Sequence, residues 1–299
     1  MQTLYSLSSF EKAEMTNKRL SSNMLNEKLD EVLNVFCVAV LYPVRIAQYA
    51  ESDNIKRSSK FLRTSEDMNV SIKIANNSFV QKLVARTDMT ERVRKEKLDK
   101  FFDEDWVKKL YKQLSETSEY KLYTLSEGSS SADDKAIVKF IWEKLMLESE
   151  DVMSYFADEL PGWEDNKDLI LMLVDNFYSN RAKTDFSRLL TADKKEYAEE
   201  LLQAVIEREE YCLELIAPKL VNWDKERVAV IDMLLLRMAI CEFLYFPTIP
   251  TKVTINEYID IAKQYSLPQS GQFVNGVLDN ILKDLERENL IRKQDRNSK

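Results

Sequence analysis

Histidine is absent from the 299 residues of this chain, which limits the chemistry that its side chains can perform. Ser-His-Asp and Cys-His nucleophile systems, His-containing zinc sites and facial-triad iron sites all need an imidazole. The glycines at 128, 162, 271 and 276 form neither a GxGxxG fingerprint nor a GxxxxGK phosphate loop. A carboxylate pair among the 51 acidic residues stays an alternative, but no spacing marks one, and solvated helix faces are the favoured interpretation. We therefore expect no enzyme, no metal site and no cofactor.

The three cysteines, Cys37, Cys212 and Cys241, stand far apart in the sequence in apolar surroundings and include no CxxC pair. This pattern indicates reduced core thiols in a cytoplasmic protein. The chain does not open with a basic segment and an apolar stretch, so no secretory signal is predicted. The apolar runs at 32–44 and 229–246 fail as membrane spans, because the first is short and broken by a proline and the second carries three charges.

Helical periodicity fills most of the chain. Four glycines and six prolines in 299 residues leave little material for hairpins and tight turns, which predicts an all-α fold. Apolar residues at three- and four-residue steps predict helices over 24–51, 67–87, 90–123, 135–157, 164–181 and 193–216. Pro43 is expected to kink or end the first of them. The small polar residues of 126–134 predict a mobile loop.

The charged run at 90–100 holds five basic residues, a feature of nucleic-acid contacts. Its three acidic residues are interleaved with them. That pattern favours a solvated helix face with pairs at i,i+4.

Arg237 lies in the apolar helical pattern of 226–246. An unpaired guanidinium there would be unfavourable, so we expect an ion pair with Asp232 or with a carboxylate of another helix. Asn222 or Asp224 is expected to cap the start of this helix.

Two prolines, Pro247 and Pro250, predict a corner after this helix, because the residue before a proline is pushed out of the α region. Thr251 or Thr254 is expected to cap the following helix, and Thr254 with Glu257 has capping-box spacing.

Three residues are unfavourable choices for the interior of the predicted C-terminal helices. The amides of Asn256 and Asn275 are expected to satisfy backbone groups of neighbouring loops. Gly276 is expected to permit close approach of another backbone segment.

The stretch KVTINEYIDIAKQYSLPQSGQFVNGVLD at 252–279, with the helical pattern of 226–246 before it, resembles the C-terminal half of the NusB family of transcription antitermination factors. Its motif residues are Ile255-Asn256-Glu257 and Phe273-Val274-Asn275-Gly276. The resemblance implies an all-α, NusB-like helical bundle with an additional helical insertion. It divides the chain into a remnant of the first family helix at 1–17, an insertion of unknown role at 18–135, and a NusB-like domain at 136–299 that matches best over 185–290.

The resemblance also implies a function in antitermination of ribosomal RNA transcription. A NusB-like factor would bind boxA-type RNA together with the ribosomal small-subunit protein NusE, within the antitermination complex of RNA polymerase in the cytoplasm and not at a membrane. The residues implied at the RNA and partner surface are Gln269, Ser270, Gln272, Phe273 and Tyr5. The implied structural motif consists of Asn256, Glu257, Asn275, Gly276 and Arg237.

The chain departs from the family pattern in its charges. Gln269 and Gln272 stand where the family carries Asp and Lys, which removes charge-dependent contacts there. Phe273 is either a stacking platform for an RNA base or a core aromatic. The family's arginine-rich arm does not precede Met1, so we expect upstream codons for Arg or Lys and weak RNA binding by this chain alone. A net charge of −8 and a pI near 5.0 suit a basic protein partner.

Two alternatives to the antitermination factor follow from the same residues. The first is a helical protein-interaction adaptor that kept the fold and lost RNA binding. The second is an RNA methyltransferase with a NusB-like domain, which is disfavoured because that domain ends this chain and no glycine-rich cofactor loop is present.

Overall fold

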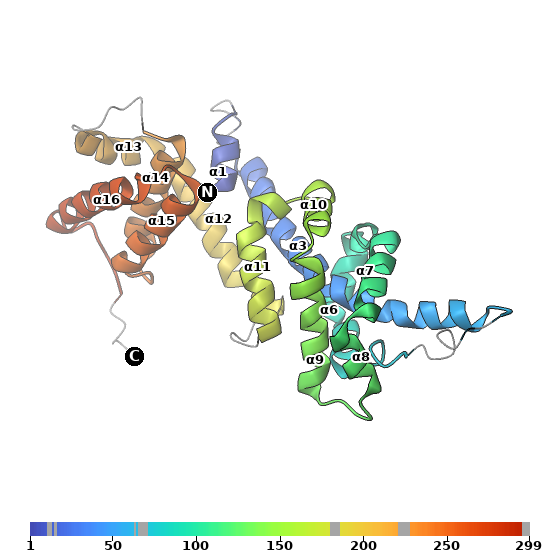
Figure 1. The fold of residues 1–299 in the computed structure, drawn as a ribbon. Coiled ribbons are helices and arrows are strands. Elements are labelled where there is room, and N and C mark those ends of the chain that lie inside the picture. The colour runs from blue at the N-terminus through green and yellow to red at the C-terminus, as the bar shows by residue number, and fades with distance from the viewer. Residues whose placement is uncertain are drawn as a thin grey trace. The chain divides into compact units, whose positions relative to one another are not determined.

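The computed structural model describes residues 1–10, 14, 17–62, 64, 71–179, 186–220 and 228–294. Every regular element among these residues is a helix, which confirms the predicted all-α fold (Figure 1). The chain divides into two compact units: unit 1 is Met1–Lys28 with Ala192–Lys299, and unit 2 is Leu29–Thr191. These boundaries reflect packing. The three segments predicted from the family resemblance, 1–17, 18–135 and 136–299, are not tested by this division and stay a prediction.

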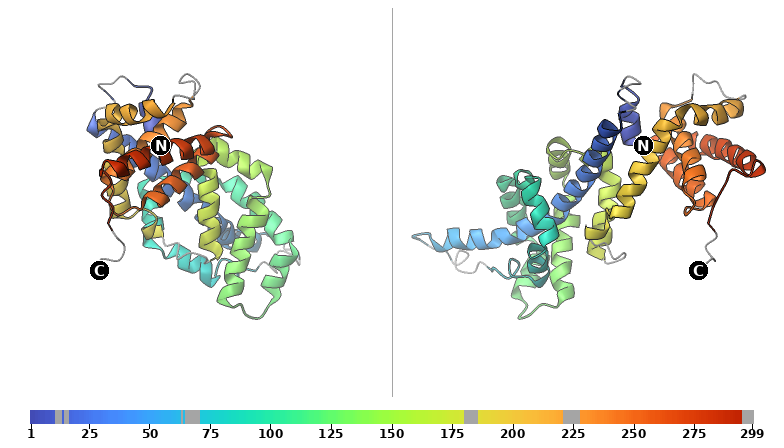
Figure 2. Two further views of the ribbon diagram at one scale, coloured as in Figure 1. Left: turned by 90° about the vertical axis from the view of Figure 1, so that its left-hand side faces the viewer. Right: turned by 180° about the vertical axis from the view of Figure 1, so that it is seen from behind.

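Unit 1 is built around one helix, α14, which is buried on nearly every side from Leu234 to Phe243. Its sequence, VIDMLLLRMAICEFLY, is apolar around the whole helix, which is typical of a helix enclosed by others. The C-terminal helices, orange to red, stay together in both views of Figure 2. The elements of unit 1 are α1 (Gln2–Leu7), the start of α3 (Lys18–Ser58), α12 (Ala192–Glu207), α13 (Glu209–Ile216), η4 (Ala217–Leu220), α14 (Val230–Tyr245), α15 (Thr251–Tyr265) and α16 (Ser270–Arg287).

Unit 2 has its own hydrophobic core around the middle of α3, where residues 35–40 are all fully buried. Shorter helices surround this segment. They are α5 (Ser78–Val84), α6 (Thr87–Lys95), η1 (Leu98–Phe101), α7 (Glu104–Glu116), α8 (Ser118–Leu125), α9 (Ser131–Phe140), the π-helical turn η2 (Ile141–Met146), α10 (Glu150–Glu159), α11 (Trp163–Ser179) and η3 (Phe186–Arg188).

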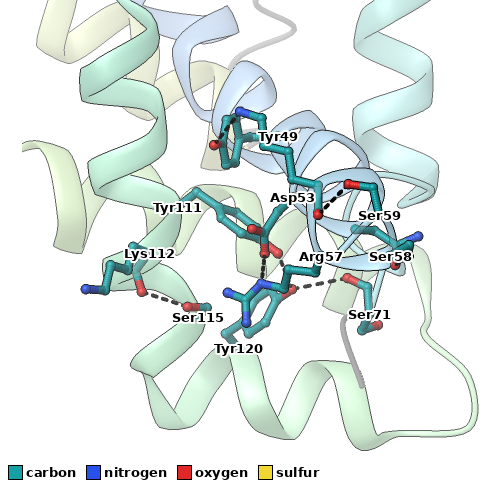
Figure 3. A network of polar contacts seen from close by, with 12 residues as sticks. Tyr49, Asp53, Arg57, Ser58, Ser59, Ser71, Tyr111, Lys112, Ser115 and Tyr120 are labelled. Carbon is teal, nitrogen blue, oxygen red and sulfur yellow. Dashed lines mark hydrogen bonds and ion pairs between the residues drawn. The ribbon is translucent and has the colours of Figure 1, made fainter. Parts of the chain in front are cut away.

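Polar contacts lie close together in the last turns of α3 and between α7 and α8 (Figure 3). Asp53 and Arg57 form an ion pair of 2.9 Å one turn apart on α3. The hydroxyls of Tyr111 and Tyr120 lie 3.4 Å apart, and Tyr120 donates to the carbonyl of Ser71 at 3.3 Å. Burial raises the pKa of both tyrosines, so their hydroxyls remain donors. The ring of Tyr111 also packs against that of Tyr49 on α3, with centroids 5.3 Å apart, so an aromatic contact connects α3 to the tyrosine pair.

The helix α3 does not end at Pro43, contrary to one of the two expected outcomes. A proline inside a helix removes one backbone hydrogen bond and crowds the preceding turn. Its neighbours Tyr42 and Val44 are 0% and 2% exposed, so burial of the flanking residues offsets that loss.

The helix predicted over 90–123 is wrong as one element. Of the helix predicted over 67–87, residues 67–70 lie outside the described part of the chain, and the prediction is wrong for 71–77, which are not helical. Lys97 adopts a left-handed conformation with φ 53°, which ends the helical path after α6. The carboxylate of Asp103 then caps α7 at the N–H of Trp106, and the hydroxyl of Thr117 caps α8 at the N–H of Tyr120. In the earlier segment α5 begins after Asn77, whose side chain accepts from two backbone N–H groups. Capping residues therefore divide what the apolar periodicity joined.

The basic residues of 90–100 do not form the expected i,i+4 pairs. Arg92 instead contacts Asp30 at 2.6 Å and Asn34 at 2.9 Å, both on α3. Arg94 and Lys97 are exposed, as expected for a solvated face.

The loop predicted at 126–134 is shorter than expected, because α9 begins at Ser131 after a capping box between Ser130 and Asp133. The Lys73 ammonium donates to the carbonyls of Tyr123 and Ser126 at 2.7 Å each, and to that of Gly128 at 3.1 Å. These contacts join the loop to the segment before α5, and its mobility stays a prediction.

The proposed caps Asn222 and Asp224 lie outside the described residues. The next helix, α15, begins at Thr251 after Pro250, with no side-chain cap. Thr254 lies one turn inside it and its hydroxyl donates to the Pro250 carbonyl at 3.5 Å, so the capping box with Glu257 is wrong.

Among the described helices, α3 alone is long and apolar enough to cross a membrane. In its most apolar window 67% of the residues are buried inside the protein. Packing in the core of unit 2 accounts for this composition.

Candidate RNA and partner interface

The corner between α15 and α16 carries four of the five residues expected at the RNA and partner surface. Gln269 precedes α16 and Gln272 lies in its first turn, and both are exposed. Ser270 and Phe273 point into unit 1 and are 3% and 5% exposed. The helix repeat therefore separates the predicted set into two exposed amides and two buried residues.

A buried hydrogen bond supports this corner from behind. The Ser270 hydroxyl donates to Oδ2 of Asp232 at 2.7 Å, and it lies 3.1 Å from the Ser266 hydroxyl. Asp232 belongs to the first turn of α14 and is 4% exposed. Its other oxygen, Oδ1, has no hydrogen-bond partner among the residues that the structure describes. The contact fixes the start of α16 to α14 and leaves half of a buried carboxylate unsatisfied.

Phe273 belongs to the hydrophobic core of unit 1. Of the two interpretations of Phe273, a stacking platform for a base or a core aromatic, its burial favours the core aromatic. A base could stack on it only after a local rearrangement, so the exposed part of this surface consists of the two glutamines.

Close approach occurs at Gly271 and not at Gly276, so the expectation for Gly276 is wrong. A Cβ atom on Gly271 would lie 3.0 Å from Cγ of Lys263 on α15. A Cβ atom on Gly276 would meet no described atom within 4 Å. Gly276 lies on the exposed face of α16, where nothing in the unit requires a glycine.

The other motif residues also lie on exposed helix faces. Asn256 and Glu257 are exposed on α15, and Asn275 is exposed on α16. No hydrogen bond joins either asparagine amide to a loop in the described part of the chain. The expected role of the two amides in satisfying loop backbone is therefore wrong.

Tyr5 lies on α1 and is 53% exposed. Within the described ranges no hydrogen bond or ring contact joins it to the α15–α16 corner. It remains a separate candidate for the surface.

Arg237 is buried and forms the expected ion pair with a carboxylate of another helix. Its guanidinium contacts Glu209 of α13 at 2.9 Å and donates to the Val205 carbonyl of α12 at 3.2 Å. These contacts connect α12 and α13 to α14.

The thiols of Cys212 and Cys241 are free and buried, and their sulfur atoms lie 3.7 Å apart.

The chemistry of the exposed corner is that of recognition. Its amides donate and accept hydrogen bonds, and the described residues hold no cluster of three potential metal ligands. Sequence reasoning missed Asp232 and Glu242 as buried carboxylates of α14. The available signal was their presence in an otherwise apolar pattern, which served as evidence against a membrane span and, for Asp232, as a possible partner for Arg237.

Comparison with known proteins gives a consistent family assignment. The NusB family model matches residues 155–283. The transcription antitermination protein NusB of Methylacidiphilum infernorum is 39% identical over 144 residues, which are 48% of this chain and 95% of that protein. NusB of Salinibacter ruber is 44% identical over 102 residues, 34% of this chain and 64% of that protein. NusB of Bacillus licheniformis is 42% identical over 90 residues, 30% of this chain and 70% of that protein. No solved structure matches the chain.

Coverage differs among these relatives. The chain spans less than two thirds of the Salinibacter protein but nearly all of the Methylacidiphilum protein. About half of this chain, including most of unit 2, lies outside the family match.

Proposed function

Because this chain belongs to the NusB family, we propose that it is a transcription antitermination factor, as its relatives are named. In this proposal it binds boxA-type RNA together with the ribosomal small-subunit protein NusE. The complex supports transcription of ribosomal RNA in the cytoplasm, within the antitermination complex of RNA polymerase.

The observation that carries the proposal is the pair of exposed amides at the start of α16. Gln269 and Gln272 face solvent, while Ser270 and Asp232 hold the helix start from behind. Amide side chains can read the edges of unpaired bases, because they donate and accept hydrogen bonds. Neither amide carries the charge that neutralises phosphate, so the cations must come from elsewhere.

The charge of the chain supports a basic partner as the source of those cations. The net charge is −8. A protein of this charge repels RNA on its own and attracts a cationic ribosomal protein. The complex then has both a recognition surface and phosphate contacts.

RNA affinity measured by fluorescence anisotropy tests this proposal. The chain, NusE and their mixture are each titrated against boxA RNA and a scrambled RNA of equal length. We expect tight binding only from the mixture and only to boxA. The variant Gln269→Ala/Gln272→Ala should weaken boxA binding by about five- to tenfold, from the loss of two hydrogen bonds. The matched control is Asn280→Ala, an exposed amide farther along α16.

The adaptor that has lost RNA binding is the second candidate, and the uncharged residues at 269 and 272 favour it. It predicts a stable complex with NusE and no preference for boxA over scrambled RNA. A mixture that forms no complex would contradict both candidates.

A further inference from the structure

A cavity of about 370 Å³ lies within unit 1, where α1, α12, α14 and α15 meet. Most of its walls are apolar and include Leu4, Leu201 and Met238. Its polar lining comes mainly from two carboxylates and two phenols, those of Glu242, Glu257, Tyr197 and Tyr258. Of the described residues that line it, none is a lysine or arginine. Met1 also lines the cavity, and burial lowers the pKa of its α-amino group to about 6, so at neutral pH this group is mostly uncharged. The cavity therefore combines an apolar wall with the negative charge of its carboxylates.

Glu242 provides the buried acid of this cavity and is 4% exposed. Both phenols serve the same carboxylate oxygen: the Tyr197 hydroxyl donates a short hydrogen bond to Oε2, and the Tyr258 hydroxyl lies 3.4 Å from it. Burial and the charge of Glu242 raise the pKa of both tyrosines, so they remain donors. The other oxygen, Oε1, accepts no hydrogen bond from the described part of the chain.

The charge of Glu242 acts on the Lys293 ammonium, but the two groups form no ion pair among the described residues. The Lys293 ammonium donates to the main-chain carbonyls of Glu242 and Phe246, at 2.8 Å each. It satisfies the C-terminal end of α14, where carbonyl groups lack helical partners. No ion pair to Glu242 exists among the described residues.

A buried carboxylate normally has a cation or several donors around it, because removing a charge from water is strongly unfavourable. Among the described residues Glu242 has donors on Oε2 only, and its side chain lines an apolar cavity large enough for a small ligand. A ligand that completes this environment has an apolar stem and a cationic head that donates hydrogen bonds.

We propose that the cavity binds a guanidinium or ammonium group on an aliphatic stem, with Oε1 of Glu242 accepting from the head and Glu257 adding negative charge at the rim. This chemistry belongs to an arginine or lysine side chain of a basic protein and to a free alkylamine or alkylguanidine. The assignment concerns unit 1 alone and does not depend on RNA binding.

Calorimetric titration with butylguanidinium tests the proposal, and N-butylurea is its neutral control of the same shape. We expect saturable binding of the cation by the whole chain and binding of the urea that is weaker by about tenfold or more, since a charged hydrogen bond is lost. Glu242→Gln should weaken binding of the cation by a similar factor, because the amide keeps an acceptor for the tyrosines and removes the charge. Glu257→Gln, at an exposed position, should change it by less than about threefold.

A second variant keeps the test decisive if Glu242→Gln loses its fold. Val253 lines the cavity and is 41% exposed, so Val253→Trp narrows it without touching Glu242. Binding of butylguanidinium should be lost. Equal binding of the cation and the urea, or unchanged binding by both variants, would overturn the assignment.

The source of the ligand is distinguished by a second titration with the tripeptide acetyl-Gly-Arg-Gly-amide. Tighter binding of this peptide than of butylguanidinium assigns the cavity to a protein side chain. Exclusion of the peptide, with butylguanidinium still bound, assigns it to a free small molecule. Neither result depends on NusE or boxA RNA, so failure here is separate from failure of the antitermination proposal.

Discussion

The two units differ in how they surround a buried carboxylate. In unit 2, Asp134 is 3% exposed and both of its oxygens accept hydrogen bonds of 2.8 Å, from the Tyr123 hydroxyl and from the Ser78 N–H. In unit 1, Asp232 and Glu242 are each 4% exposed, and within the described ranges each accepts hydrogen bonds on one oxygen only.

The difference indicates that the carboxylate of unit 2 has a structural role, whereas those of unit 1 are able to bind a further group. Asp134 joins α9 to α5 and α8, and its environment is complete within unit 2. The two carboxylates of α14 have an environment that the described part of the chain leaves incomplete. Buried polar groups without partners are uncommon in folded proteins, so Oδ1 of Asp232 marks a place where a group from outside is expected. Glu242 is the carboxylate of α14 that lines a cavity.

The largest expected effect is that of Asp134→Ala. The Tyr123 hydroxyl and the Ser78 N–H would both lose their acceptor inside unit 2, which should lower the free energy of unfolding by about 2 to 4 kcal/mol. Urea denaturation followed by circular dichroism measures it. Asp133→Ala is the matched control, because this neighbour is exposed and the Ser130 cap of α9 stays in place, so the loss should be clearly smaller. An equal loss of unfolding free energy in the two variants would contradict the structural role of Asp134.

Acid should weaken unit 2 through the same residue. Burial tends to raise the pKa of Asp134, but hydrogen bonds from Ser129, Ser78 and Tyr123 outweigh it and hold the pKa at about 2. The ordinary value is 3.8, so the ionised form stabilises the fold above pH 3.8, and this contribution is lost as the pH falls through about 2. Urea midpoints of the wild type and Asp134→Asn between pH 5 and pH 2 should therefore converge. Parallel curves would mean that Asp134 does not titrate in this window.

In unit 1, Asp232→Asn should change the free energy of unfolding by less than about 1 kcal/mol, in the stabilising direction. The amide oxygen still accepts from Ser270, and a buried charge with an unsatisfied oxygen is removed. Thermal denaturation at neutral pH measures the change. A loss above about 2 kcal/mol would show that Oδ1 already has a partner, and the contrast between the units would no longer hold.

The smallest expected effect lies on the exposed face of α16. Gly276→Ala should stabilise the protein by about 0.5 to 1 kcal/mol, because alanine favours a helix and its Cβ would meet no described atom within 4 Å. Chemical denaturation of the wild type and of Gly276→Ala measures the difference in the free energy of unfolding. Destabilisation by the alanine would instead support the close approach of a backbone segment that the sequence predicted at Gly276.

Sequence reasoning predicted the helical fold, the corner after α14 and the ion pair of Arg237, because proline, apolar periodicity and an isolated charge act locally. It did not predict where helices stop in unit 2, where Asp103 and Thr117 cap new helices inside a continuous apolar pattern. It gave Asn275 and Gly276 packing roles, since residue type alone does not say which face of a helix is covered. The cavity at Glu242 depends on contacts between residues far apart in sequence, such as Tyr197 and Tyr258, and no local signal marks it.

Transcription through a terminator tests the antitermination function most directly. A template with a boxA leader upstream of the terminator is transcribed by bacterial RNA polymerase with the other antitermination factors, and this chain and NusE are added singly and together. We predict that read-through rises only when both proteins are present and boxA is intact. Read-through that does not change when this chain is added, with NusE and boxA present, would contradict the assignment.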